Sequence, residues 1–439
     1  REDKADLINE FFSDINSRHH KYGDSPKVLE PNVKMSAGGL RDFQAIEWIY
    51  IFKYNTLLHE QTEMTQAEAF VRILEEKKFT TPDECNRLLN SYRLILGIRN
   101  LLHIINKQKV DRLEFNAQTR ISKILTHHQN SLALFMKEYF EATNTIYRFT
   151  HSMIIKFRDE ISNPLPDTLA IELDDDFILK RKTISVKGRN VLSLSEILRG
   201  FYYRALHGAF FDEPLRSLII ESVKQYRLHP LFEPESSVFF REILKLPKNV
   251  GETLSVMNEL GVLGTFLPEF GDLVGFLQHG VYHCYTADEH TLFTIKNLEL
   301  LEKEKSPLGD LYGSIKQREL IFLGLLFHDI AKPINIAGHE IIGAEIAESV
   351  MNHLGYSEDE IEIVCSLVKN HLIMEQIAFR RNLNDPETLN NFVSKFKSAE
   401  ELDMLYLVTY ADLSAVNPAV WTSWKSDLLF ELYVKTRSM

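Results

Sequence analysis

The stretch ELIFLGLLF, residues 319–327, is apolar on almost every side when it is drawn as a helix. A helix at a protein surface keeps one polar face, so this stretch is predicted to be a buried helix. It ends at His328 and Asp329, two side chains that can bind a metal ion, and Lys332 follows three residues later. The sequence therefore predicts a helical core with metal-capable groups at the end of a buried helix.

The length and composition are those of a globular protein. The chain has 439 residues, a length that suits about two to four domains. Hydrophobic residues make up 44% of it, an ordinary share for a globular protein. The three cysteines are far apart, so no disulfide framework is predicted and a reducing cytoplasm is the expected location. A net charge of -12 argues against a nucleic-acid partner. No apolar run approaches the roughly 18 residues of a membrane span, so no membrane partner is expected.

Helical patterns cover most of the chain. A change occurs at 158–190, where two prolines and two short alternating stretches (169–173 and 182–186) predict a small sheet. We predict a mainly α fold, with a helical bundle, a small β-containing insertion and an all-helical C-terminal domain. One helix start is explicit, because Thr81 is a plausible N-cap and Glu84 would complete a capping box. The long helical stretches before the insertion are 40–54, 65–78, 80–106 and 128–157.

Six histidines and aspartates adjoin expected core helices in the C-terminal half of the chain. They are His290, His328, Asp329, His339, His371 and Asp412. Imidazole and carboxylate without thiolate suit Mn²⁺, Mg²⁺, Fe²⁺ or Zn²⁺ at a reactive site and do not suit a structural zinc site. Four of them (His290, His328, Asp329 and Asp412) could hold one ion, and His339 and His371 could add a second ion with Asp329 as the bridge.

Such a site favours phosphoester hydrolysis. A bound divalent ion lowers the pKa of water and polarises a phosphoryl oxygen. We predict catalytic roles for Asp329 and Lys332, and phosphate binding by Lys332, Arg380 and Arg381. The alternative is that each histidine is an ordinary hydrogen-bonded core residue, which is common for a single His beside an apolar helix. The ordered set of ligands is a much stronger signal than the His-Asp pair alone.

The order of these residues resembles that of the HD superfamily of metal-dependent phosphohydrolases. The surrounding sequence is more specific, and it resembles the family of bifunctional PII uridylyltransferase/uridylyl-removing enzymes. The similar segments in the C-terminal half are 261–292, 379–392 and 410–433, and those upstream are 29–44 and 99–122.

The resemblance implies a plan of a nucleotidyltransferase domain with a helical companion, an HD domain and two ACT domains. We therefore expect a remnant of the transferase domain at 1–45, the helical companion domain at 46–165, a linker region with a small sheet at 166–250 and the HD domain at 251–439. The implied activity is removal of UMP from the uridylylated PII signalling protein in nitrogen regulation. Mn²⁺ or Mg²⁺ is the expected cofactor, with Fe²⁺ and Zn²⁺ as alternatives.

The chain departs from the family pattern at several points. No Gly-Ser followed by an Asp-x-Asp pair precedes residue 29, so uridylyltransferase activity is expected to be absent. The chain starts with Arg1, and we expect it to be part of a longer protein. Asn370 stands before His371 where the family has paired histidines, and Ala331 stands where it has glycine.

Several alternatives remain open at this stage. Gly38 and Gly39 precede a helix and could cradle a phosphate, although we favour a tight turn. Glu30 and Asp42 are candidates for a residual transferase role. Trp421 and Trp424 are predicted to pack in a core. For the whole chain, the alternatives are a phosphohydrolase acting on free or cyclic nucleotides and a non-catalytic regulatory fragment.

Overall fold

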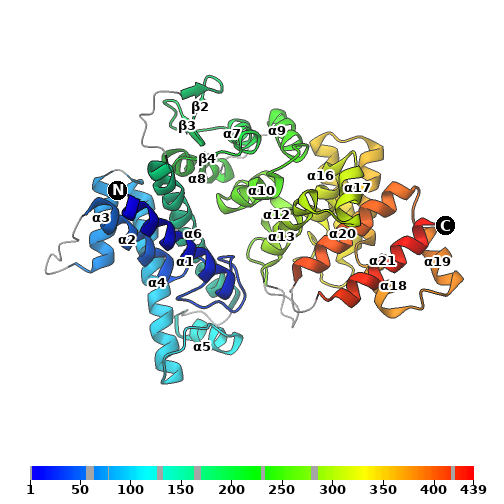
Figure 1. Ribbon diagram of the computed structural model, residues 1–439, viewed down its shortest axis with the longest axis horizontal. Coiled ribbons are helices and arrows are strands. Elements are labelled where there is room, and N and C mark those ends of the chain that lie inside the picture. Colours follow the sequence, from blue (N-terminus) through cyan, green and yellow to red (C-terminus); the bar gives the residue numbers. More distant parts are fainter. Residues whose placement is uncertain are drawn as a thin grey trace. The chain divides into compact units, whose positions relative to one another are not determined.

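The computed structural model is mainly helical with one small sheet, as the sequence predicts (Figure 1). It describes residues 2–55, 64–77, 79–125, 132–162, 170–228, 233–277, 285–416 and 421–439. The chain divides into two compact units, residues 1–188 with 211–218 and residues 189–210 with 219–439. The division into four family segments stays a prediction. Among the helices described, none combines the length and the apolar character that a membrane crossing requires.

The first unit is a helical bundle with an aromatic core. Phe43 on α2 stacks at a tilt on Tyr92 of α4, with 4.5 Å between ring centroids, and Phe70 on α3 meets Phe43 edge-on at 5.7 Å. These rings are held by helices whose apolar residues recur at the spacing seen in the sequence. The helices are α1 (Glu2–Tyr22), α2 (Leu40–Tyr54), α3 (Gln66–Glu76), α4 (Pro82–Asn106), α5 (Phe115–Leu125) and α6 (Leu132–Ser162).

The predicted small sheet is present and has the strand order β1-β2-β3-β4. The first three strands pair in antiparallel fashion, with Ile178 of β2 opposite Ser185 of β3. Phe177 and Ile184 are buried, while the first strand is exposed, so one face of the sheet formed by β2 and β3 contributes to the core. The strands are β1 (Ala170–Glu172), β2 (Phe177–Lys180), β3 (Thr183–Val186) and β4 (Phe210–Phe211).

The start of α4 corrects one prediction. Thr81 caps the helix as expected, accepting a hydrogen bond from the backbone N–H of Glu84 at 3.3 Å. The Glu84 carboxylate, however, pairs with Arg87 at 2.7 Å and with Arg148, so the predicted capping box is wrong. Glu84 is completely buried, and a buried carboxylate is stabilised far more by cationic partners than by a backbone amide.

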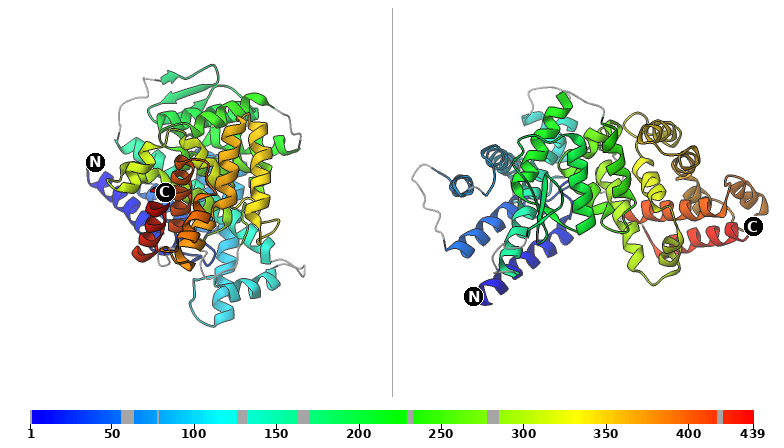
Figure 2. Two further views of the ribbon diagram at one scale, coloured as in Figure 1. Left: turned by 90° about the vertical axis from the view of Figure 1, so that its right-hand side faces the viewer. Right: turned by 90° about the horizontal axis from the view of Figure 1, so that it is seen from above.

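The second unit is built around α15 (Arg318–Phe327), the apolar helix of the sequence analysis. All residues from Leu320 to Phe327 are buried, and α13, α16, α17 and α20 pack around the helix. Figures 1 and 2 show the yellow to orange helices of this unit lying side by side. Gly324 allows α17 to approach closely, because a Cβ atom there would lie 3.2 Å from Leu367. The predicted burial of this helix is therefore confirmed.

The other elements from residue 194 onward complete this unit. Beginning in the first unit, α8 continues into the second. The elements are α7 (Leu194–His207), α8 (Glu213–Leu228), α9 (Pro234–Leu244), α10 (Val250–Glu259), α11 (Leu263–Phe266), α12 (Pro268–Gly271), α13 (Ala287–Leu300), η1 (Leu301–Lys303), α14 (Pro307–Ser314), α16 (His339–Leu354), α17 (Glu358–Asn370), α18 (Ile373–Arg380), α19 (Pro386–Val393), α20 (Ala399–Val416) and α21 (Ser423–Arg437).

The tryptophan prediction is half wrong. Trp421 packs edge-on against Tyr410, with 5.7 Å between ring centroids. Trp424 is 62% exposed and does not belong to a core. Helix α21 begins only at Ser423, so the two indoles do not share a helical face as their spacing suggested.

Glu47 on α2 yields a stability prediction. Its side chain is buried, and burial raises its pKa from 4.5 to about 7 although a hydrogen bond with Gln66 opposes the shift. A carboxyl group whose pKa is raised in the folded state lowers the free energy of unfolding at high pH. The loss begins as the pH rises above the unfolded-state pKa and is complete above the folded-state pKa. Glu47→Gln should therefore raise the free energy of unfolding by up to about 3 kcal/mol at pH 8 and by much less at pH 5. Urea denaturation at both pH values measures this, and an equal effect at the two pH values would contradict it.

Candidate metal centre

The six predicted ligands lie together at the ends of the helices around α15. His290 lies in the first turn of α13 and His339 begins α16, while His328 and His371 cap the C-terminal ends of α15 and α17. Asp412 lies on α20, and Asp329 follows His328 directly. The sequence predicted each of these positions near a helix end, and the packing of the helices brings them to one place.

The first group of ligands is His290, His328 and Asp412, whose ligand atoms lie within 4.8 Å of one another. Nε2 of His290 is 2.8 Å from Oδ1 of Asp412, and Nε2 of His328 is 3.6 Å from the same oxygen. One ion could therefore be shared by two imidazoles and a carboxylate.

The second group is Asp329, His339 and His371, again within 4.8 Å of one another. Oδ1 of Asp329 lies 3.3 Å from Nε2 of His339 and 4.0 Å from Nε2 of His371. Its other oxygen, Oδ2, lies 3.2 Å from Nε2 of His328 in the first group. Asp329 thus occupies the position between the groups that a bridging carboxylate needs.

Backbone carbonyls orient three of the imidazoles. Nδ1 of His328, His339 and His371 lies 2.6, 2.8 and 2.7 Å from the carbonyl oxygen three residues earlier in each case. A carbonyl can only accept, so each Nδ1 carries a proton, and each Nε2 presents a lone pair whenever the imidazole is neutral. Metal-binding histidines are oriented in this way, with one nitrogen fixed by the protein and the other left for the ion.

The lone pairs face each other, and this supports a cation at the site. Nε2 of His339 and Nε2 of His371 are 3.3 Å apart, and two lone pairs at this distance repel unless a cation or a shared proton lies between them. Nε2 of His328 is also buried, and it lies 3.2 Å from a carboxylate oxygen of Asp329 and 3.6 Å from one of Asp412. This set of imidazole nitrogens and carboxylate oxygens fits a divalent metal.

The charges of the site favour the same interpretation. Burial opposes a charge on His328, but the carboxylates of Asp329 and Asp412 raise its pKa to about 10. Burial would raise the pKa of Asp329, yet His328 and Lys332 hold it well below its usual range. Burial and the nearby His328 lower the pKa of His371 to about 4. Without a metal ion, His371 is thus neutral, and His328 carries a positive charge beside the ionised carboxylate of Asp329. A bound cation would supply that positive charge in place of the His328 proton.

The three predicted phosphate-binding residues differ in their placement. Nζ of Lys332 lies 2.6 Å from Oδ2 of Asp329, and its side chain is only 10% exposed. Arg380 ends α18 and Arg381 follows it, and both are exposed. Only Lys332 is therefore in direct contact with the ligand cluster.

Glu375 on α18 belongs to the surroundings of the site and was missed by sequence reasoning. Burial and then the charge of Asp412 raise its pKa, while Arg380 and Lys425 oppose that shift. Glu375 therefore lies within electrostatic reach of both a ligand and a predicted phosphate-binding residue. No motif marks it, because it becomes recognisable only when α18 packs beside α20.

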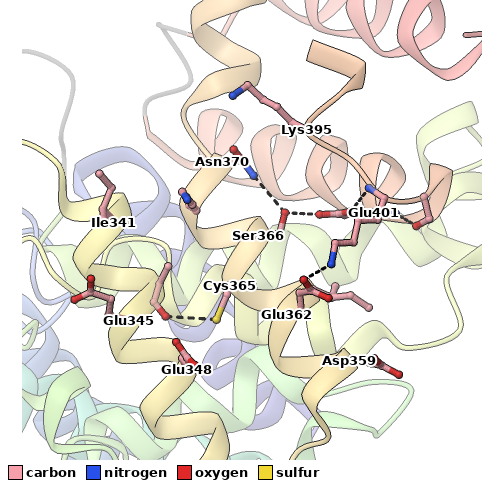
Figure 3. A pocket seen from close by; sticks show the side chains of 15 residues that line it. Ile341, Glu345, Glu348, Asp359, Glu362, Cys365, Ser366, Asn370, Lys395 and Glu401 are labelled. Atoms are coloured by element: carbon pink, nitrogen blue, oxygen red, sulfur yellow. Dashed lines mark hydrogen bonds and ion pairs between the residues drawn. The ribbon is translucent and has the colours of Figure 1, made fainter. Parts of the chain in front are cut away.

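Asn370, the departure from the paired histidines, faces away from the ligands and into a groove. Its Nδ2 donates to Oγ of Ser366 at 3.2 Å, and Ser366 in turn contacts Glu401 (Figure 3). The groove has a volume of about 730 Å³, and its described lining residues come from α16, α17, the segment before α20 and the first turn of α20. They do not include the six candidate ligands. The second candidate group consists of Asp329, His339 and His371, and Asn370 does not belong to it.

This placement gives a prediction about metal content. We expect Asn370→Ala to bind as much Mn²⁺ as the unmodified chain, since Asn370 contributes no ligand atom. The neighbouring His371→Ala should lose at least one of the bound ions, because it removes one of three ligands of the second group. Elemental analysis after dialysis measures both variants, and loss of metal from Asn370→Ala alone would refute the assignment.

The glycine loop of the first unit has a structural role, as we favoured. A Cβ atom on Gly38 would lie 2.1 Å from the carbonyl oxygen of Thr143, and its φ of +74° suits glycine. The Asp42 carboxylate accepts from the Gly38 N–H at 2.8 Å and from Arg18 at 2.7 Å, so it already occupies the position of a bound anion. Glu30 accepts from the N–H of Phe115 at 3.0 Å and from Arg112 at 2.9 Å.

Two segments of the chain match family models. Residues 8–154 match the model described as GlnD PII-uridylyltransferase, and residues 287–412 match the HD domain. The HD match begins just before His290 and ends at Asp412, so it includes all six ligands.

Curated relatives match almost the whole chain. A bifunctional uridylyltransferase/uridylyl-removing enzyme of Pseudomonas syringae pv. syringae (strain B728a) is 33% identical over 439 residues, which is 96% of this chain and 47% of that protein. Enzymes of the same name from Pseudomonas aeruginosa (strain UCBPP-PA14) and Nitrosococcus oceani (strain ATCC 19707) are each 32% identical over 96% of this chain and 47% of their own length. The chain thus spans about half the length of the curated relatives it matches.

Proposed function

The chain carries an HD domain and is a homologue of the bifunctional uridylyltransferase/uridylyl-removing enzymes, and from this premise we propose that it hydrolyses the phosphodiester of uridylylated PII and releases UMP. The coarser assignment, an enzyme of the HD phosphohydrolase type, follows from the HD match and the homologues. The substrate, the product and the role in nitrogen regulation are part of the proposal.

One observation carries the proposal. Nε2 of His328, His339 and His371 lie 3.2, 3.3 and 4.0 Å from the carboxylate oxygens of Asp329, and backbone carbonyls fix the Nδ1 proton of each ring. A purely structural histidine cluster would be stabilised by donors paired with acceptors. Here Nε2 of His339 and Nε2 of the neutral His371 face each other at 3.3 Å, which is the arrangement of a cation site.

The residues present have distinct roles in such a reaction. When bound, a divalent ion lowers the pKa of a coordinated water and offsets charge on the phosphoryl oxygens. Asp329 would be shared by the two candidate groups, because its two oxygens lie 3.2 Å from His328 and 3.3 Å from His339. Lys332 neutralises part of its charge and offers a cation to the phosphate. In the proposed substrate UMP is attached to a tyrosine of PII, so the leaving group is a tyrosyl oxygen. With a free pKa of about 10, this oxygen is a fair leaving group and needs little help from an acid.

The alternative function is hydrolysis of a free or cyclic nucleotide, since the metal centre alone would also support it. The protein substrate is favoured because relatives named as uridylyl-removing enzymes match 96% of the chain, well beyond the HD segment. We also expect no transfer of UMP from UTP, because the acidic pair that this chemistry requires does not precede residue 29.

A substrate panel tests the proposal. The purified chain with Mn²⁺ is offered uridylylated PII, UTP with unmodified PII, and a set of free and cyclic nucleotides. Release of UMP from the protein substrate is the expected result. Turnover of the free nucleotides together with an untouched protein substrate would overturn the proposal in favour of the alternative.

A further inference from the structure

Three exposed isoleucines lie beside the metal ligands. Ile334 is 65% exposed, and Ile336 and Ile341 are each 53% exposed. The first two lie on the loop 333–338, which joins Lys332 to His339, and Ile341 lies in the first turn of α16. Single exposed aliphatic side chains are ordinary, but here three occur within eight residues, and we refer to Ile334, Ile336 and Ile341 as the apolar rim.

The loop is held in place by hydrogen bonds to its own backbone. The N–H groups of Ile334 and Asn335 both donate to the carbonyl of Ala331 at 3.0 Å. The carbonyl of Ile336 accepts from Nδ1 of His339 at 2.8 Å. The exposed isoleucine side chains therefore lie on a segment whose C-terminal end is held by the hydrogen bond between Ile336 and His339, a candidate metal ligand.

The chemistry of the rim does not suit a free nucleotide. No charged residue lies between Lys332 and Glu340, in a chain with a net charge of -12. A free nucleotide is recognised through hydrogen bonds and cations around its base and phosphates. Aliphatic side chains gain free energy when another apolar surface covers them, and a protein surface supplies such a cover.

The rim continues into the groove of Figure 3. Ile341 also lines that groove, together with Ala344 and Ile363, while charged side chains such as Glu345 and Lys369 lie around it. A partner resting on the rim would therefore find a cavity of about 730 Å³ next to it, with both apolar and polar walls. A combination of an apolar patch with a polar surround is typical of protein interfaces.

We propose that Ile334, Ile336 and Ile341 form the docking surface for the protein part of a protein-linked phosphodiester substrate. This inference rests on the proposed function and adds where the substrate protein binds. A phosphodiester on a protein reaches the ligand cluster only if the surface around it approaches the rim of the site. The rim would then contribute affinity for the protein without touching the reacting atoms.

A double variant, Ile334→Ser with Ile341→Ser, tests the inference. Ile336 is kept, because its carbonyl orients His339. The variant should lower kcat/KM for uridylylated PII about 10- to 100-fold, mainly through KM, since two exposed aliphatic side chains no longer become buried. Hydrolysis of bis(p-nitrophenyl) phosphate with Mn²⁺ should stay unchanged. The matched control is Ile104→Ser with Ile171→Ser, which are 71% and 61% exposed in the other unit.

The outcomes separate the inference from the proposed function. If the unmodified chain releases no UMP from uridylylated PII, the proposed function fails and the inference fails with it. If it does release UMP and the rim variant is equally efficient, only the docking surface is refuted. An equal loss on both substrates would also refute it, because the loop would then be supporting the metal site. A loss confined to the protein substrate and absent in the control variant supports it.

Discussion

Replacing His328 with alanine is expected to remove bound metal and to lower phosphodiester hydrolysis by about 10³-fold or more, equivalent to roughly 4 kcal/mol in the barrier. His328 lies between the two ligand groups, 3.6 Å from Asp412 and 3.2 Å from Asp329. Its loss therefore removes a ligand of the first group and leaves both carboxylates without the imidazole that lies between them. Metal content and the rate of hydrolysis of a small aryl phosphodiester are the measurements.

His353→Ala is the matched control for this variant. His353 lies on α16, is exposed, and places Nδ1 2.7 Å from the carbonyl of Ser349. It therefore shares the backbone contact of the ligand histidines but has no place in either ligand group. We expect its metal content and activity to match those of the unmodified chain. A His328→Ala chain that folds and keeps full metal content would refute the ligand assignment.

Gly38→Ala is expected to lower the free energy of unfolding by about 3 kcal/mol or more. The added Cβ would lie 2.1 Å from the carbonyl oxygen of Thr143, and backbone cannot move aside as a flexible side chain can. The φ of +74° adds strain for any residue with a side chain. The shift would also disturb the hydrogen bond from the Gly38 N–H to Asp42. Urea denaturation measures the loss.

Gly97→Ala provides the control for this substitution. Gly97 lies within α4, and a Cβ atom there meets nothing within 4 Å among the described residues. Alanine is the better helix former, so Gly97→Ala should be neutral or stabilising by up to about 1 kcal/mol. Equal destabilisation by the two substitutions would show that the contact with Thr143 is not the cause.

The sequence predicted the central part of the fold because the relevant signal is local. Residues 319–327 are apolar all round, and only burial satisfies such a helix. The candidate ligands were found for a related reason, since histidine and aspartate at the ends of apolar helices must either find partners or bind an ion. Their convergence is a property of helix packing, and only the structure shows it.

The features that could not be predicted from the sequence depend on contacts between residues that are distant in the chain. Glu84 was expected to close a local capping box, but it pairs with Arg148, 64 positions away, because burial favours a cation. Glu375 carries no motif, and its pKa is raised first by burial and then by the charge of Asp412, both of which arise only in the folded packing. Asn370 stands where the family has a histidine, but its side chain contacts Ser366 and lines the groove, while the neighbouring His371 belongs to the second candidate group. Periodicity and motif order do not report which neighbour a side chain meets.

The central claim is that these six side chains hold a divalent metal. Anomalous diffraction from crystals of the chain grown with Mn²⁺ tests it most directly. The expected result is one or two peaks at about 2.0–2.3 Å from Nε2 of the ligand histidines and from the carboxylate oxygens, with Asp329 bridging if two ions are present. Crystals with ordered His328 and Asp412 but no anomalous peak at saturating Mn²⁺ would contradict the claim.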